Sequence, residues 1–196
     1  MSGIVGSYFN TRGSGVVAKL GTDGQVFTST GAGLSQGFEA AAAGGALVQL
    51  VNFQTGTLAT GTTLVPHDDT VPQNDEGTEF MTLAITPTSD TNKLLINVIL
   101  NMAGSAWANN PYLVSLFQDD TANALACQWH KHGQGNTMAE TWNFNHYMTS
   151  GTAIETTFKV RCGAQFATTV SFNGEGGLRY TGGITVSSMT IMEIAV

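Results

Sequence analysis

Residues 93–102, Lys-Leu-Leu-Ile-Asn-Val-Ile-Leu-Asn-Met, give the strongest structural signal in this chain. Every even-numbered position is apolar, whereas the odd-numbered positions mix Lys93 and two asparagines with Leu95 and Ile99. Side chains alternate across a strand, so this period of two predicts a long β-strand whose even-numbered face lies in a core. Leu95 and Ile99 then need cover on the opposite face. We expect a partner subunit to supply it; the alternative is a loop or a preceding segment of the same chain.

The composition favours sheets and turns over solvated helices. The 196 residues allow one substantial domain with an appendage. Only 11% of the residues are Asp, Glu, Lys or Arg, against about 25% in ordinary soluble domains. The net charge of −7, without a basic cluster, argues against nucleic acid or an anionic membrane as a partner.

The two cysteines, Cys127 and Cys162, are too few for a disulfide framework or a cysteine-rich zinc site. We expect both to be buried, reduced thiols that pack as small apolar groups. Residues 1–6 lack the basic and apolar regions of a signal peptide, and no apolar run approaches about 18 residues. The expectation is a protein made and folded in a cytoplasm, with no membrane insertion.

The first zone, residues 1–45, is rich in small residues and too poor in apolar ones to form a core of its own. It is predicted to be an extended Gly-rich N-terminal arm that anchors the protein to other chains. Within it, residues 21–24 suggest a turn, residues 26–30 a short strand, and residues 39–43 at most one helical turn.

Residues 46–196 are predicted to form the head domain. They begin with a strand over 47–53, and the prolines at 66 and 72 then exclude a central strand from the turn-rich stretch that follows. Beyond residue 80, short strands alternate with turn residues about every ten positions, as in an all-β antiparallel sandwich of jelly-roll-like type. The expected strands are 80–86, 94–102, 112–118, 124–129, 141–148, 156–162, 168–172 and 188–196.

Several short motifs follow one another in a consistent order from Lys19 onward. They are residues 20–31, 68–73 with 76–77, 85–89, 92–96, 116–119 with 123–125, 157–161, 172–174 and 190–194. Together they resemble the fibre and tail proteins of tailed bacteriophages that end in a β-domain. The resemblance implies a virion structural protein, a homotrimer with a jelly-roll-like head, mounted on other virion proteins through residues 1–45. It leaves tail fibre, collar fibre, head fibre and capsid decoration open as the component.

His130-Lys131-His132 is the clearest candidate for metal binding. In an extended segment, residues at i and i+2 point to the same side, so six imidazoles of a trimer could meet one axial ion in octahedral geometry. The glycines at 133 and 135 favour the alternative, in which His130 and His132 lie on a surface loop and bind no metal.

Two acidic stretches are predicted to be turns. His67-Asp68-Asp69 could form an acid–base site and residues 119–123 a calcium loop, but Asp side chains beside turn residues commonly cap their own backbone. A calcium loop would also need more carboxylates at fixed spacing. We therefore expect structural roles for both stretches.

Aromatic and amide side chains form two candidate receptor-binding groups, because aromatic rings stack on the apolar faces of sugars. The first group lies on a predicted loop and consists of Trp107, Asn109, Asn110 and Tyr112. The second group consists of Trp129 and Trp142, with Phe144, His146 and Tyr147 as further members. The alternative for all of them is packing in a core or an interface.

No serine, cysteine or paired-carboxylate arrangement has the context of a catalytic site, so we expect neither an enzyme nor a cofactor. The sequence thus predicts a bacteriophage virion structural protein, assembled in the host cytoplasm, that forms a trimeric fibre-like appendage and contacts a host surface glycan or protein. Two alternatives remain: a capsid decoration or cement protein without receptor binding, and a non-viral C1q-like or lectin-type binding module.

Overall fold

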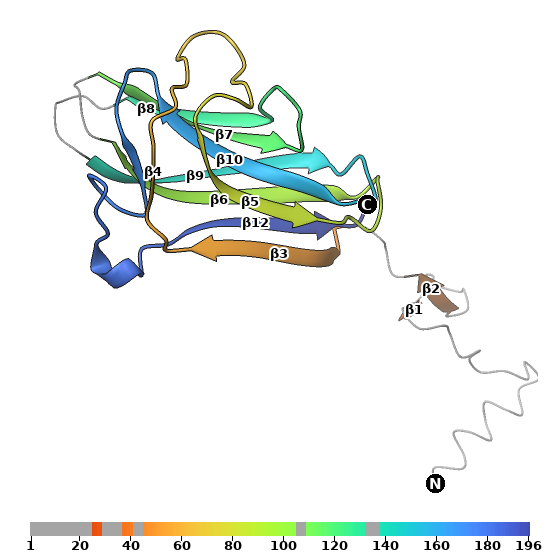
Figure 1. Cartoon of the computed structure of the whole chain (residues 1–196). Coiled ribbons are helices and arrows are strands. Elements are labelled where there is room, and N and C mark those ends of the chain that lie inside the picture. Colours follow the sequence, from red (N-terminus) through yellow and green to blue (C-terminus); the bar gives the residue numbers. More distant parts are fainter. Residues whose placement is uncertain (1–24, 29–36, 41–44, 105–108, 132–137) are drawn as a thin grey trace, which may run out of the picture. The chain divides into compact units, whose positions relative to one another are not determined.

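The computed structural model describes residues 25–28, 37–40, 45–104, 109–131 and 138–196 (Figure 1). The chain divides into two units, residues 1–44 and residues 45–196, which we call the arm and the head. Among the described residues there is no α-helix, and no helix that could span a membrane.

The arm contains one antiparallel pair of short strands, β1 (Gln25–Thr28) and β2 (Gly37–Ala40). The predicted strand over 26–30 overlaps β1. The predicted helical turn over 39–43 is wrong at its first two residues, because Glu39 and Ala40 belong to β2 and pair with β1. The predicted turn at 21–24 lies outside the described residues.

The head is an antiparallel β-sandwich, as predicted from the spacing of its strands and turns. Its strands are β3 (Leu47–Thr55), β4 (Ala59–Gly61), β5 (Thr78–Ile85), β6 (Lys93–Gly104), β7 (Pro111–Gln118), β8 (Ala126–Lys131), β9 (Met138–Thr149), β10 (Thr156–Ala164), β11 (Val170–Phe172) and β12 (Ser187–Ile194). Strand β4, with only three residues, has no counterpart among the predicted strands, and a 3-10 turn (η1, Thr181–Gly183) lies between β11 and β12.

The two sheets have four and six strands. The smaller sheet has the order β5-β10-β7-β8, and the larger has the order β3-β12-β6-β11-β4. Strands β12 and β11 pair successively along one edge of β6, and β9 pairs along the other edge for the full length of β6. Strand β6 is therefore the centre of the larger sheet.

The even-numbered residues of β6 form the middle of the core, as predicted. Leu94, Ile96, Val98 and Leu100 are fully buried, and Met102 is nearly so. They pack against inward-facing side chains of the smaller sheet, including Val114 and Phe158. At one end of the core, the thiol of Cys162 donates to the Met102 sulfur at 3.0 Å.

Strand β7 is buried on both faces. Tyr112, Val114 and Leu116 belong to the core, while Leu113 and Phe117 point outward yet are 5% and 1% exposed. The segment 62–77 runs over this side of the smaller sheet (Figure 1) and is bonded to the loop between β7 and β8, where the Asn74 backbone N–H donates to the Ala122 carbonyl. The segment before β5 thus covers the smaller sheet, and not Leu95 and Ile99 as the single-chain alternative proposed.

Both ends of the head meet at one edge. The Gly45 backbone N–H donates to the Ala195 carbonyl, and the Ala195 N–H donates to the Ala46 carbonyl. This pairing extends the β3–β12 ladder and holds the end of the last strand in the sheet. We call this end of the sandwich, which includes the start of β6 at Lys93, the arm end of the head.

The cysteine prediction is correct at one position and wrong at the other. Cys162 is buried, and its burial strongly raises the pKa of the thiol. Cys127 is exposed, because it lies on the outer side of β8, which is an edge strand of the smaller sheet.

Candidate binding surfaces

The outer face of the larger sheet is defined here by the outward-facing side chains of β3, β12, β6 and β9. Strand pairing places Leu50, Met192, Leu95 and Tyr147 side by side across these four strands. Leu50 is 52% exposed and Tyr147 58%, whereas Leu95 and Met192 are partly buried. We call this set the apolar row. It lies near the arm end, next to Leu47, which is 57% exposed.

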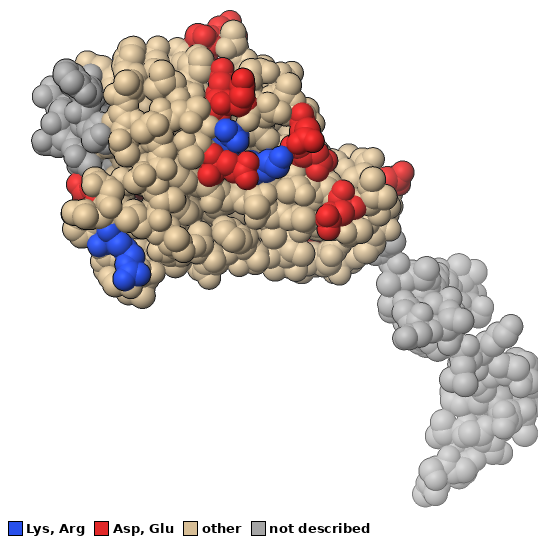
Figure 2. Space-filling view, in the orientation of Figure 1, with Lys and Arg blue, Asp and Glu red and all other residues tan. Residues whose placement is uncertain are grey.

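The outer face is almost free of charge. Lys93 is its one charged side chain in the described strands, and its ammonium group donates to the Thr149 hydroxyl at 2.6 Å. The next positions are neutral amides and hydroxyls: the Asn97 amide, for example, donates to Asn145 at 2.5 Å. In Figure 2 the stretch over β3 is accordingly tan, without acidic or basic side chains.

The predicted interface residues Leu95 and Ile99 both lie on this face. Leu95 belongs to the apolar row, and Ile99 lies further along β6, between Ser188 and Asn143 on the neighbouring strands. Both are partly buried by those neighbours. Their role in an oligomer stays a prediction.

His130 links β8, an edge strand of the smaller sheet, to β9, an edge strand of the larger sheet. Its Nε2 lies 3.3 Å from a carboxylate oxygen of Glu140 on β9, and its ring meets Trp142 edge-on with centroids 6.1 Å apart. His132 lies outside the described residues. Among those described, no three His, Cys, Asp or Glu side chains converge as metal ligands, so the metal site also stays a prediction.

Three of the predicted receptor-binding residues are buried, contrary to the prediction. The Asn110 amide is bonded to both backbone groups of Phe166, and Tyr112 and Trp142 are 0% and 4% exposed. Tyr112 packs so closely on Gly104 that a Cβ there would lie 2.1 Å from its ring. These side chains serve packing because each faces inward from its strand or loop.

The remaining members do not form one platform. Trp129 is 56% exposed and its ring packs on His67, with centroids 4.6 Å apart. Asn109 is exposed, and Trp107 lies outside the described residues. On β9, strand alternation separates the outward-facing Tyr147 from Phe144 and His146, which point inward and are partly buried.

The acidic turns have the structural roles expected of them. One Asp68 carboxylate oxygen accepts from both the backbone N–H and the hydroxyl of Thr70, and these bonds lower the pKa of Asp68. Asp119 accepts from the Thr156 hydroxyl at 2.8 Å and from the Thr157 backbone N–H at 2.7 Å. Asp119 thereby fixes the β7–β8 turn to the start of β10.

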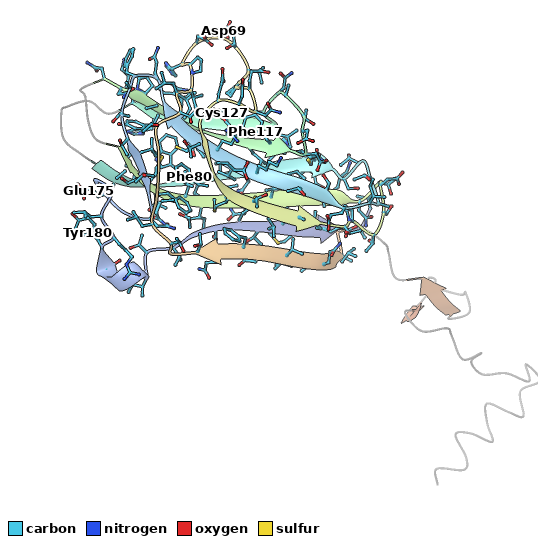
Figure 3. The ribbon with its side chains drawn as sticks, viewed as in Figure 1. Asp69, Phe80, Phe117, Cys127, Glu175 and Tyr180 are labelled. Carbon is cyan, nitrogen blue, oxygen red and sulfur yellow. The ribbon has the colours of Figure 1, made fainter. Side chains whose placement is uncertain are left out.

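A pocket of about 240 Å³ lies at the end of the head opposite the arm end. Its floor is made by the last residues of β6 and the first of β9, and its wall by the segment 173–185 between β11 and β12. Its lining residues are Asn101, Met102, Ala139, Glu140, Thr141, Asn173, Gly174, Glu175, Tyr180, Thr181 and Thr185. We call it the distal pocket; Figure 3 labels Glu175 and Tyr180 at this end.

A smaller cavity of about 90 Å³ adjoins the distal pocket through Glu140 and Thr141. It lies between the edge strands β8 and β9 and is also lined by Trp129, His130 and Trp142. The Trp142 indole N–H is buried and has no hydrogen-bond acceptor among the described residues. Buried donors rarely lack a hydrogen-bond acceptor. The cavity is therefore lined by an unsatisfied N–H donor as well as by aromatic rings.

The sequence analysis missed the distal pocket. Gly176, Gly177, Gly182 and Gly183 have positive φ angles and form the turns of this segment, as glycine-rich runs commonly do. The available signal was Glu175 and Tyr180, a carboxylate and an aromatic ring placed between glycine turns in a chain with few charges. Nothing in the sequence places that segment over the ends of β6 and β9.

Comparisons with known proteins find only solved structures of low similarity. No family model and no curated protein matches this chain. Similar solved structures include Eiger TNF from S. frugiperda (8% identity, TM-score 0.43, covering 74% of this chain and 92% of that one). A second is a chain of infectious bursal disease virus, Gx strain (7%, TM-score 0.35, 87% and 45%). A third is the enzymatically active domain of bacteriophage CBA120 tailspike protein 4 (14%, TM-score 0.25, 76% and 20%).

This chain spans less than half of the bursal disease virus chain and a fifth of the tailspike chain. All three TM-scores lie below 0.5. The neighbours include viral and non-viral proteins, and one fold can serve many unrelated functions. They therefore do not separate a virion protein from the other classes considered.

Proposed function

We propose that this chain is a bacteriophage virion structural protein, the subunit of a trimeric fibre-like appendage whose arm binds the particle and whose head contacts the host surface. The observation on which the proposal chiefly rests is the exposed apolar row on a nearly uncharged sheet face. The order of motifs that resembles phage fibre and tail proteins adds the virion context.

The outer face has the composition of a face that copies of the chain can bury together. Leu50 and Tyr147 are half exposed although large and apolar, and grouped exposure of this kind is uncommon on a monomer. Covering neutral amides and hydroxyls removes few charges from water, which is the pattern of interface cores. Lys93, the only charged group that the described strands place on this face, lies at its margin, where it can keep its contact with water.

The geometry of the head also suits attachment at one end and contact at the other. The arm enters the head at Gly45, beside the start of β6, and the distal pocket lies at the end of β6 near Asn101. Asn101 lies eight positions after Lys93 on β6, a distance of about 26 Å at ~3.3 Å per position. A head held by its arm would therefore present the pocket end away from the particle.

The mass of the full chain in solution tests the oligomer. We expect three times the chain mass of 20.5 kDa. Leu50→Lys places a charge in the apolar row and should reduce the mass to that of one chain. Val71→Lys is the matched control and should leave the mass of the trimer unchanged. Val71 is similarly exposed (50%) but lies on the segment that covers the smaller sheet. A full-length chain that stays monomeric at high concentration would refute the trimer.

Antibody labelling of purified phage particles tests the location. Label on a tail, collar or head fibre is expected. Label distributed over the capsid shell would favour the decoration protein, and particles without label would remove the virion assignment.

A further inference from the structure

The distal pocket has the features of a small-molecule site. Such sites combine a mostly apolar lining with a few placed polar groups, and their volumes begin at about 300 Å³ for drug-sized ligands. The 240 Å³ of this pocket suits one ring of six atoms with its substituents. The apolar part of the lining comes from Met102, Ala139 and the ring of Tyr180, which is 51% exposed.

Glu175 is the least expected group in the lining. Its side chain is partly buried, yet its carboxylate has no hydrogen-bond or ion-pair partner among the described residues. Its backbone is held firmly, because the N–H and the carbonyl of Glu175 both bond to Leu178, and Gly176 and Gly177 supply the positive φ angles of the turn between them. A carboxylate on a fixed turn, partly removed from water and without a partner, is set up to accept hydrogen bonds from a ligand.

Threonine hydroxyls provide acceptors on two sides of the pocket. On the sheet side, Thr141 donates its proton to Asn101, at 2.6 Å, which leaves the lone pairs of its hydroxyl. On the loop side, the hydroxyls of Thr181 and Thr185 bond to each other at 2.7 Å. Glu175 and these hydroxyls together form a set of acceptors around an apolar floor.

From this geometry we propose that the distal pocket binds a neutral sugar residue, with the Tyr180 ring against the C–H face of the sugar and the Glu175 carboxylate accepting from its hydroxyls. A sugar ring offers several donors in different directions and one apolar face, which matches acceptors on opposite walls and an aromatic side chain. A single ammonium group could donate to Glu175 but is too small to donate also to the Thr141 hydroxyl on the opposite side of the pocket. Glu140 already contacts His130, which leaves Glu175 as the pocket's one unpaired carboxylate among the described residues.

The pocket is built within one chain, so it does not require the trimer. It rests on the proposed function only in its role, which would be contact with a glycan of the host surface. Many copies on one particle would then turn weak single sites into firm attachment.

Saturation-transfer NMR on the full-length chain tests the proposal with three separate probes: glucose, galactose and N-acetylglucosamine. We expect saturable binding of at least one of them. Tyr180→Ala should weaken it about tenfold or more, since it removes the stacking ring, and Glu175→Gln should do the same by replacing an acceptor with a donor. Phe166→Ala is the matched control, because Phe166 is equally exposed (54%) but does not line the pocket, and it should leave the affinity unchanged.

Three results would overturn the proposal: no saturable binding of any of the sugars, binding that both pocket variants leave intact, or saturable binding of ethylammonium at the pocket in place of the sugars. The amide spectrum of each variant verifies that it is folded. If the chain is a monomer that binds sugar through Tyr180, the trimer is refuted and the sugar site stands. If the chain is a trimer that binds none of the sugars, the sugar site is refuted and the trimer stands.

Discussion

At the scale of single residues, Glu193 shows how the chain manages its few charges. It is the one fully buried carboxylate among the described residues, on the inward face of β12 near the arm end. Burial opposes its ionisation, but hydrogen bonds donated by Asn92, Gln49 and Thr88 outweigh that effect and lower its pKa from 4.5 to about 2. Glu193 thereby fastens the loop between β5 and β6 to the last strand.

This arrangement predicts an acid-sensitive fold. Because the pKa of Glu193 is lower in the folded than in the unfolded chain, its contribution to stability is complete above pH 4.5 and is lost as the pH falls towards about 2. Glu193→Gln should lower the free energy of unfolding at neutral pH by about 1.5–3 kcal/mol. It should also flatten the decline between pH 4.5 and 2, as measured by urea unfolding across that range.

Glu155→Gln is the control, since Glu155 is an exposed loop residue, and it should leave the stability at neutral pH unchanged. An equal decline with pH in the wild type and in Glu193→Gln would contradict the role given to Glu193.

At the scale of elements, the two faces of β6 have different roles. Its even-numbered side chains form the core, and the odd-numbered ones form part of the outer face. Apart from Lys93 at its start, the odd-numbered face of β6 carries no charge, and in the proposed trimer this face would not remain in water.

Two leucines on β6 separate these roles. Leu100→Ala opens a cavity in the core and should cost about 2–5 kcal/mol of unfolding free energy at any protein concentration. Leu95→Ala removes a partly buried side chain, so it should cost less in a dilute chain but weaken the oligomer. Urea unfolding measured at several concentrations, together with the mass in solution, distinguishes the two. If Leu95→Ala left the oligomer unaffected, Leu95 would not belong to an interface.

The sequence predicted those elements whose signal is local. The period of two over residues 93–102 was enough for β6, and the turn-rich stretch with prolines at 66 and 72 was correctly kept out of the strands. Burial that depends on distant partners was not predictable: Asn110 precedes a predicted strand and Tyr112 begins it, but only the structure shows that Asn110 is bonded to Phe166 and that Tyr112 packs on Gly104. The distal pocket was missed for the same reason, because residues 173–185 reach the ends of β6 and β9 only through the pairing of β11 and β12 with β6.

At the scale of the whole molecule, the head and the arm are separate units, and the apolar row belongs to the head alone. Assembly and attachment should therefore be separable functions. The head would bring the copies together, and the arm would connect them to the particle.

Deletion of residues 1–44 tests this separation. The shortened chain should keep the mass of a trimer in solution, because every residue of the apolar row is retained, and it should no longer be incorporated into particles. The full-length chain, produced in parallel, is the control for both measurements. Loss of the trimer with the arm would show that the arm, and not the outer face, holds the copies together.

The pairing of Gly45 with Ala195 has a practical consequence for engineering. A tag or cargo peptide fused after Val196 would leave the head beside Gly45 and far from the distal pocket. Fluorescent labels could then be appended there without blocking the distal pocket, and a short linker from Val196 to Gly45 would permit circular permutants of the sandwich to be constructed.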